Sequence, residues 1–442
     1  MADAVDAEPG VGDPYFPGLG NGGYDVRSYD VALSVDPATG RISGVTTAAA
    51  TATQSLSSFT LDLVGLEVAA ITVDDESAAF ERADRELRVK PESPIESGDD
   101  FTVAVTYAGD PEPVVSEALG AVGWTDIDDG SFVLSEPEGG ATWFPVNDHP
   151  VDKATYRFLI TVPEGTEAAA NGVLTEERDN GDGTTTWIWT MDDPMASYLA
   201  TVVIGDLIFE EEEEGPAGVA IRNVYMEDVA DAASAVFERQ GEMIDFFDDL
   251  FGPYPFDVYG AVVVDVGLGL ALETQTLSLF GRDIVSAGSA AEFVVAHELA
   301  HQWFGNSVSL RTWQDIWLNE GFSTYAEWLW LDHDGDTPLD VQVREARQFL
   351  RSTGSDDVII GDPGAADLFA LAVYDRGALT LHALRTTVGD DAFFVTMQRW
   401  AADFAHGNAT TADFVALAES VSGAELDEFF DAWLFRPGLP PP

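Results

Sequence analysis

The feature that most constrains the fold is a change in the spacing of apolar residues near the middle of the chain. Up to about residue 205, short segments alternate apolar and polar residues, for example Tyr29 to Ser34 and Phe101 to Tyr107. This is the pattern of half-buried β-strands. From about residue 228, as in Asp228 to Leu250, apolar residues recur at helical spacing. We therefore expect an α+β chain, with an all-β saddle or sandwich domain over residues 1–207 and a mostly α-helical domain over residues 208–442.

The helical part also contains shorter predicted elements. Two apolar runs, Tyr259 to Val266 and Leu272 to Phe280, are predicted to be strands. The segment Ser289 to Gly305 is predicted to be a helix with Ser289 as its N-cap, and another helix is expected within Thr312 to Leu331. The acidic run Glu210 to Glu214 is predicted to be a linker or an exposed turn.

The charge of the chain is extreme. Asp and Glu number 79 against 20 Lys and Arg, which gives a formal net charge of −59, and the only lysines are Lys90 and Lys153. Such a shell repels itself in dilute buffer, whereas molar salt shortens the Debye length to about 3 Å and screens the repulsion. We therefore predict a protein adapted to high salt, of halophile origin. Nucleic acid is not expected as a partner, because its phosphates would be repelled.

Other features of the composition limit the class of protein. Hydrophobic residues make up 46% of the chain, enough to build cores despite the charge. Cysteine is absent, so a metal site must use histidine and carboxylate ligands. No apolar run is long enough to span a membrane, and the N-terminus lacks the features of a secretory signal. We expect no membrane partner and a cytoplasmic location, although a signal already removed would leave the same sequence.

One short motif carries the chemistry. His297-Glu298-Leu299-Ala300-His301 is an H-E-x-x-H sequence inside a predicted helix. Residues four apart lie on one helix face, so both imidazoles can reach one ion, while Glu298 lies beside it. A catalytic zinc needs a third protein ligand and an open position. Glu320, on the following predicted helix, is the candidate for that ligand.

This pattern predicts hydrolysis by a zinc-activated water, with one Zn²⁺ per chain. Zinc lowers the pKa of a bound water to roughly 7, and Glu298 would act as general base and then as proton donor to the leaving amine. Two alternatives remain for the motif itself. The histidines could be paired with neighbouring carboxylates on a solvated helix, or the zinc could be structural, which would require a fourth protein ligand.

The chain resembles the aminopeptidase N family of zinc metallopeptidases, which are gluzincins and include the leukotriene hydrolases. The resemblance is carried by the segment 295–305, which reads V-A-H-E-L-A-H-Q-W-F-G, and by the segment 317–322, which reads W-L-N-E-G-F. It implies a thermolysin-like catalytic domain behind an N-terminal β-saddle domain. It also implies an aminopeptidase that acts on peptides with a free N-terminus.

Three further site residues follow from the resemblance. The family's G-x-M-E-N strand, whose glutamate binds the substrate's α-amine, corresponds to residues 270–274, which read L-A-L-E-T. Glu273 is kept, but the replaced neighbours put the shape of the subsite in doubt. The family's Y-x-[KR]-G tyrosine, which stabilises the transition state, corresponds to Tyr374. A residue preceding the family's F-P-x-x-D-x-P segment also contacts the amine, and Phe144 to Pro150 places Glu136 at that position.

The sequence also departs from the family. Typical members continue into a small β-sandwich and a long helical domain, whereas this sequence ends at Pro442. We therefore expect a short two-domain form and consider leukotriene hydrolysis less favoured. A thermolysin-type endopeptidase is one rival, opposed by Glu273 and Glu136. A non-enzymatic binding protein with a relict site is another, opposed by the intact ligands and base. The sequence does not predict the preferred N-terminal residue or the oligomeric state.

The charge generates the first testable prediction. Carboxylates spread over a surface with almost no lysine repel one another over about 10 Å at 0.1 M salt but only about 3 Å at 1 M. The melting temperature should therefore climb steadily from 0.1 M towards several molar KCl, and activity should follow it. Thermal unfolding followed by circular dichroism across that series measures this. A curve that is flat or falls with salt would refute salt adaptation.

Overall fold

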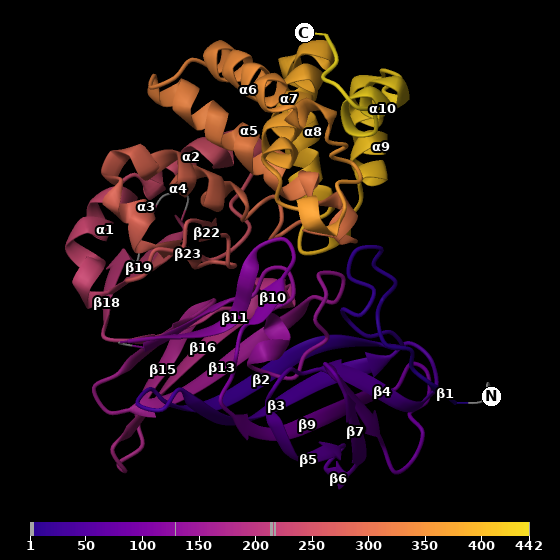
Figure 1. The fold of residues 1–442 in the computed structure, drawn as a ribbon, viewed down its shortest axis with the longest axis vertical. Helices are drawn as coiled ribbons and strands as arrows, with labels where there is room; N and C mark the ends of the chain where they lie inside the picture. Colours follow the sequence, from indigo (N-terminus) through magenta and orange to yellow (C-terminus); the bar gives the residue numbers. More distant parts are fainter. Residues whose placement is uncertain (1–3, 129, 213–214, 216–217, 442) are drawn as a thin grey trace. The chain divides into compact units, whose positions relative to one another are not determined.

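The fold was analysed in a computed structural model that describes residues 4–128, 130–212, 215 and 218–441. The chain divides into two compact units, which are coloured along the sequence in Figure 1. The first comprises Met1–Phe209, Val224–Asp228 and Thr274–Leu279, and the second comprises Glu210–Asn223, Val229–Glu273 and Phe280–Pro442. The β-rich first part followed by a mostly helical part confirms the predicted fold class. The division after residue 207 stays a prediction.

The first unit is built from three sheets. An eight-stranded sheet has the order β15-β16-β13-β2-β3-β9-β5-β6, a five-stranded sheet the order β10-β11-β12-β17-β14, and a four-stranded sheet the order β1-β4-β8-β7. The strands are β1 (Val5–Asp6), β2 (Tyr24–Asp36), β3 (Arg41–Ala52), β4 (Leu56–Asp62), β5 (Glu67–Val73), β6 (Glu76–Ser77), β7 (Ala79–Ala83), β8 (Glu86–Lys90), β9 (Asp100–Gly109), β10 (Val114–Ser116), β11 (Gly120–Ile127), β12 (Gly130–Leu134), β13 (Ala154–Pro163), β14 (Glu167–Ala170), β15 (Val173–Asp179), β16 (Thr184–Met195) and β17 (Val202–Gly205).

Alternation along the strands explains which face of the large sheet is buried. On β13, the side chains of Tyr156, Phe158 and Ile160 are buried and alternate with more exposed residues. The ring of Tyr156 stacks on that of Phe158 at 5.6 Å between centroids, and on that of Tyr29 of β2 at 5.1 Å. Aromatic pairs at such distances contribute beyond the burial of their area. The period-2 pattern in the sequence therefore corresponds to a real core face.

A further sheet has the order β18-β19-β21-β23-β22, with β20 paired to β19, and β24 pairs β25 in parallel. These strands are β18 (Leu207–Glu212), β19 (Ala220–Met226), β20 (Val258–Tyr259), β21 (Ala261–Val264), β22 (Ala271–Leu272), β23 (Ser278–Gly281), β24 (Ser309–Leu310) and β25 (Asn408–Ala409).

Helices make up most of the remaining second unit. They are α1 (Ala230–Phe237), α2 (Gln240–Phe251), α3 (Arg282–Ser286), α4 (Glu292–Ala300), α5 (Trp317–Asp334), α6 (Leu339–Thr353), α7 (Leu371–Val388), α8 (Asp390–Asp403), α9 (Thr411–Ser422) and α10 (Asp427–Leu434). None of the helices in the described part of the chain combines the length and apolar character that a membrane span needs.

Two predicted elements are interrupted in the structure. The helix expected over Asp228 to Leu250 breaks between α1 and α2 at Arg239. The Arg239 guanidinium pairs with Glu292 at 2.6 Å and Asp334 at 2.6 Å, contacts from distant elements that periodicity cannot reveal. The strand expected over Leu272 to Phe280 is split into β22 and β23 by a turn, in which Thr276 has φ 65°.

Two local predictions were also wrong. Ser289 is not the N-cap of the motif helix, because a 3₁₀ turn, Gly288–Ala291, precedes α4, which begins at Glu292 without a side-chain cap. Part of the acidic run predicted as a linker is strand, since β18 extends to Glu212. Residues 213 and 214 of that run lie outside the described residues.

Two glycines bring α5 and α7 into backbone contact. A Cβ added to Gly377 would lie 2.6 Å from the Cα of Gly321, and a Cβ added to Gly321 would lie 2.7 Å from the Cα of Gly377. Both distances are shorter than real Cβ contacts allow, so only glycine permits this approach. Glu320 directly precedes the first glycine, and Tyr374 lies one helical turn before the second. The crossing therefore sets the spacing of both side chains.

This contact generates a prediction. Gly377→Ala should push the two helices apart, because the new methyl group meets backbone, and should lower the free energy of unfolding by about 1–3 kcal/mol. Gly267→Ala is the matched control, since its added Cβ would meet only Asp283 at 3.7 Å, an ordinary contact. Chemical denaturation in constant salt measures both variants. Wild-type stability in Gly377→Ala would mean that the helices can separate without cost.

Candidate metal centre and active site

Helix α4 presents the two motif histidines towards one point. His297 lies in its last turn and His301 is its C-cap, so the residues are one helical turn apart. Their Nε2 atoms are 3.1 Å from each other. Both side chains are largely buried, with His297 at 9% and His301 at 2% exposure.

Helix α5 adds Glu320 to the same point. Its Oε2 lies 3.4 Å from the Nε2 of His297 and 3.4 Å from the Nε2 of His301. In a tetrahedral zinc site with metal–nitrogen distances of about 2.0–2.1 Å, neighbouring ligand atoms are about 3.3 Å apart. The three atoms therefore have the mutual spacing that one such ion requires.

The outer nitrogens of both imidazoles have acceptors of their own. His297 Nδ1 lies 3.4 Å from Oε2 of Glu327, and His301 Nδ1 lies 3.1 Å from the carbonyl oxygen of Phe304. A carbonyl oxygen can only accept a hydrogen bond, so we assign the proton of His301 to Nδ1. An ionised carboxylate also only accepts, so we assign the proton of His297 to its Nδ1, which faces Glu327. This tautomer leaves the Nε2 lone pairs free to bind a metal.

Buried acids surround this point. Glu273, Glu298 and His301 offer atoms that lie within 4.8 Å of one another, and the two glutamates are at most 6% exposed. Burial raises the pKa of Glu298 to about 7, opposed by the two histidines. Burial also tends to raise the pKa of Glu320, but the histidines beside it lower that pKa to about 2. Buried carboxylates are costly without a compensating cation, which supports a divalent ion here.

Glu273 follows β22 and is held through its backbone. Its carbonyl oxygen accepts hydrogen bonds from Nε2 of Gln302 at 3.2 Å and Nδ2 of Asn306 at 2.6 Å. Its side-chain Oε1 is buried and has no hydrogen-bond partner within the described part of the chain. Burial raises the pKa of this carboxyl. A buried acceptor without a partner suits a donor brought by a ligand.

Tyr374 lies in the first turn of α7, with its ring over the imidazole of His297. The ring centroids are 5.9 Å apart and the planes differ by 24°. The neighbouring Arg376 is fully buried and fixes this end of the helix. Its guanidinium donates to five backbone carbonyls, those of Trp433, Asp356, Val358, Ala432 and Arg436.

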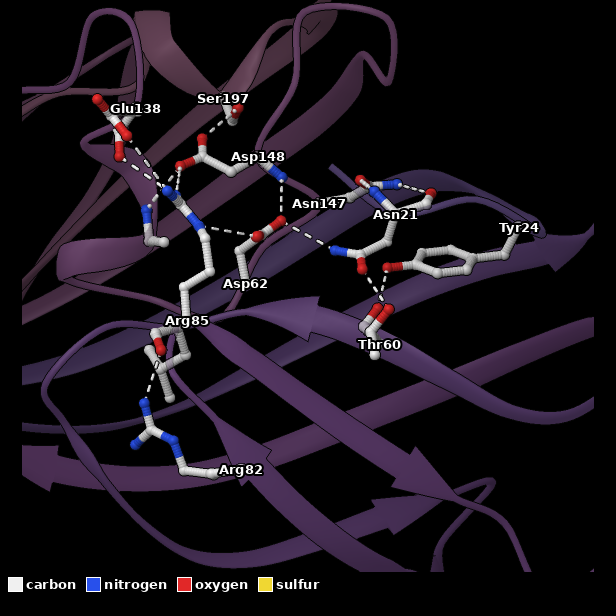
Figure 2. Close-up of polar contacts among 12 residues, drawn as sticks. Asn21, Tyr24, Thr60, Asp62, Arg82, Arg85, Glu138, Asn147, Asp148 and Ser197 are labelled. Atoms are coloured by element: carbon white, nitrogen blue, oxygen red, sulfur yellow. Dashed lines mark hydrogen bonds and ion pairs between the residues drawn. The ribbon is translucent and has the colours of Figure 1, made fainter. Parts of the chain in front are cut away.

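Glu136 belongs to the first unit, where its side chain is buried. The segment that follows it is held by Arg85, as Figure 2 shows. Arg85 donates from Nη1 to Oε2 of Glu138 at 3.3 Å and from Nη2 to Oδ2 of Asp148 at 3.3 Å, and its Nε pairs with Asp62 at 3.1 Å. Asp148 is the aspartate of the F-P-x-x-D-x-P segment, so this segment is anchored by a buried ion-pair cluster.

Uncharged side chains also donate hydrogen bonds to the carboxylates of this cluster. Asp62 accepts from Nδ2 of Asn21 at 2.9 Å, and Asp148 accepts from Oγ of Ser197 at 2.8 Å (Figure 2). Burial raises the pKa of Asp62 to about 7, opposed by Arg85. One arginine thus faces three carboxylates, and removing it would leave uncompensated buried charge.

The structure thus brings together His297, His301, Glu320, Glu298, Glu273 and Tyr374 within the second unit, whereas Glu136 lies in the first. Sequence reasoning missed the contact between Glu327 and His297. Glu327 lies two helical turns after Glu320, so the shared face of α5 was a signal that could have identified it. It also missed Gln302 and Asn306, which lie just beyond the motif.

Two family models match the chain. The Peptidase M1 N-terminal domain matches residues 26–199, and the Peptidase family M1 domain matches residues 235–433. Curated relatives include Aminopeptidase M1 of Arabidopsis thaliana, 28% identical over 69% of this chain and 36% of that protein. Aminopeptidase N of Streptomyces lividans is 26% identical over 71% of this chain and 39% of that protein. The chain therefore spans little more than a third of the length of these relatives.

A solved structure matches over nearly its full length. The M1 zinc metallopeptidase of Deinococcus radiodurans has a TM-score of 0.90 and 33% identity, covering 98% of this chain and 99% of that chain. A mutant of that enzyme was solved bound to a Tyr-Ser-Ala substrate. The fold and the site define the class of zinc metallopeptidases. Within that class, the chain belongs to peptidase family M1.

Proposed function

We propose that this protein is a zinc-dependent aminopeptidase that removes N-terminal residues from peptides. The observation that carries the proposal is the convergence of two imidazoles and a carboxylate at 3.1–3.4 Å beside two further buried carboxylates. In this proposal His297, His301 and Glu320 hold one Zn²⁺. The other two carboxylates, Glu298 and Glu273, serve the chemistry and the substrate.

Different residues of the chain perform different steps of the proposed reaction. Bound zinc would supply a Lewis acid and lower the pKa of a water molecule to roughly 7. Glu298, a buried group with a pKa of about 7, takes the proton of the attacking water and passes it to the leaving amine. The Tyr374 hydroxyl, on the ring that lies over His297, donates a hydrogen bond to the developing oxyanion.

Glu273 makes the enzyme an exopeptidase in this proposal. Its free, buried Oε1 accepts a charge-assisted hydrogen bond from the substrate's terminal ammonium, and Glu136 adds a second acceptor. A mutant of the similar Deinococcus enzyme has been solved bound to a Tyr-Ser-Ala substrate. Mutants described as two-domain M1 zinc metallopeptidases, which are equally similar to this chain, have been solved bound to L-tryptophan and to L-arginine. These ligands share a free α-amine, which supports recognition of the N-terminus. Glu273 argues against the thermolysin-type endopeptidase alternative.

The setting of the enzyme is proposed from its charge. We propose two functional domains divided after residue 207, working in a salt-rich cytoplasm. The net charge of −59 supports the salt-rich setting.

The role of Glu298 predicts a separation of metal binding from turnover. Glu298→Gln should retain zinc but lose at least about 10²-fold in kcat, because only proton transfer is removed. Zinc content and hydrolysis of an aminoacyl chromogenic substrate, with and without chelator, measure the two properties. Glu345→Gln, on the exposed side of α6, is the control and should retain both. Near-normal kcat in Glu298→Gln would mean that another group is the base.

The role of Glu273 predicts a loss that depends on the substrate's amine. Glu273→Gln removes the charge from the ammonium contact, worth roughly 1.5–3 kcal/mol, so kcat/KM on free-amine peptides should fall about 10- to 150-fold. The residual cleavage of N-acetylated peptides of the same sequence should not change. Equal losses on both substrates would show that Glu273 does not bind the amine. A wild-type enzyme that cleaves both peptides equally well would favour the endopeptidase.

A further inference from the structure

A groove beside α6 concentrates arginine in a chain that has little of it. Arg344, Arg347 and Arg351 follow one face of the helix at spacings of three and four residues. They line a cavity of about 680 Å³. The other lining residues are Asp340, Val343, Gln348 and Ser352 of α6, and His382 of α7.

Carboxylates of the described residues neutralise these arginines only weakly. Arg347 and Arg351 have no carboxylate partner within the described residues, although the protein holds 79 acids against 20 basic residues. Arg347 donates instead to the carbonyl of Pro440 and lies over the ring of Trp433 at 5.7 Å. Arg344 reaches only Asp340, at 4.0 Å between exposed side chains. Within the described residues, the three guanidinium groups therefore share one carboxylate, that of Asp340, at the 4.0 Å limit of an ion pair.

The positive charges of the groove act on one another. Burial lowers the pKa of Arg347, and the positive charge of Arg351 lowers it further. Elsewhere most arginines are matched to carboxylates, as Arg239 is to Glu242 and Asp334. Positive charge that is only weakly compensated in a groove of a strongly acidic chain suits an anion supplied from outside.

We propose that this groove binds an extended acidic segment of another polypeptide. Arg347 is only 9% exposed, so the exposed pair Arg344 and Arg351 makes the contacts, and the helical rise places these two about 10.5 Å apart along the axis. Residues of an extended chain are about 3.3 Å apart, so carboxylates three or four residues apart in one acidic segment can reach both guanidinium groups. Val343 and the arginine stems supply an apolar floor for the backbone. Nucleic acid fits poorly, because its continuous phosphate charge faces a net charge of −59.

Salt affects the repulsion between the acidic segment and the protein differently from the direct contacts in the groove. At 1 M salt the Debye length is about 3 Å, so repulsion between the peptide and distant carboxylates of the protein is largely screened. Hydrogen-bonded contacts between a guanidinium and a carboxylate, at about 2.7–2.9 Å, lie within that length. Binding is therefore expected to persist in molar salt, where repulsion between the acidic segment and the distant carboxylates of the protein is screened.

The test uses a labelled hexapeptide and the full-length holoprotein. N-acetyl-hexaglutamate amide with a C-terminal fluorophore lacks a free amine, so the proposed aminopeptidase site does not recognise it. Its fluorescence anisotropy is titrated with protein from 0.2 to 2 M KCl, beside the equivalent hexaglutamine peptide. We expect saturable binding of the glutamate peptide alone. The double variant Arg344→Gln/Arg351→Gln should bind it roughly tenfold more weakly.

Controls separate this inference from a loss of fold and from the proposed activity. Arg311→Gln/Arg399→Gln removes the same charge from two exposed arginines outside the groove and should leave binding unchanged. Both double variants should keep wild-type turnover of a short substrate. Equal binding to the groove variant, or equal binding of the glutamine peptide, would overturn the proposal. Displacement by inorganic phosphate at the peptide's own concentration would also overturn it, by showing a site for small anions only.

Discussion

The approach of two helix backbones at Gly321 and Gly377 is the constraint on which the catalytic geometry depends. Each glycine occupies a position where a single methyl group would collide with the other helix at 2.6–2.7 Å. Because of that contact, α5 delivers Glu320 to the histidines of α4, and α7 places the ring of Tyr374 over His297. Arg376 then locks the start of α7 to backbone carbonyls near the end of the chain. Gly321, Gly377 and Arg376, which belong to the two family motifs that also contain Glu320 and Tyr374, therefore support the site structurally.

The protein is strongly acidic overall, and some of its few arginines lie where several carboxylates meet. Arg85 neutralises carboxylates beneath the segment that carries Glu138 and Asp148, and Arg239 joins three acids at the break between α1 and α2. At the metal centre, no arginine among the described residues pairs with the buried glutamates. The buried glutamates there are left for a metal ion and a substrate ammonium to compensate, which links binding of both to the stability of the site.

Much of this was predictable from the sequence because it rests on local patterns. The period of apolar residues gave the order of strands and helices, and helical spacing placed His297 and His301 on one face. Contacts between distant segments were not predictable. The break near Arg239 coincides with ion pairs from Arg239 to Glu292 and Asp334, and the turn that follows the buried Glu273 contains Thr276 at positive φ. The contact of Glu327 with His297 joins α5 to α4, and the only sequence signal for it was the helix face that Glu327 shares with Glu320.

Zinc content per chain tests the central claim most directly. After dialysis against a weak chelator, elemental analysis should find one zinc in the wild-type chain. It should find little in Glu320→Ala, because two imidazoles alone hold zinc poorly. Full occupancy in that variant, or a wild-type chain that binds no zinc, would contradict the account.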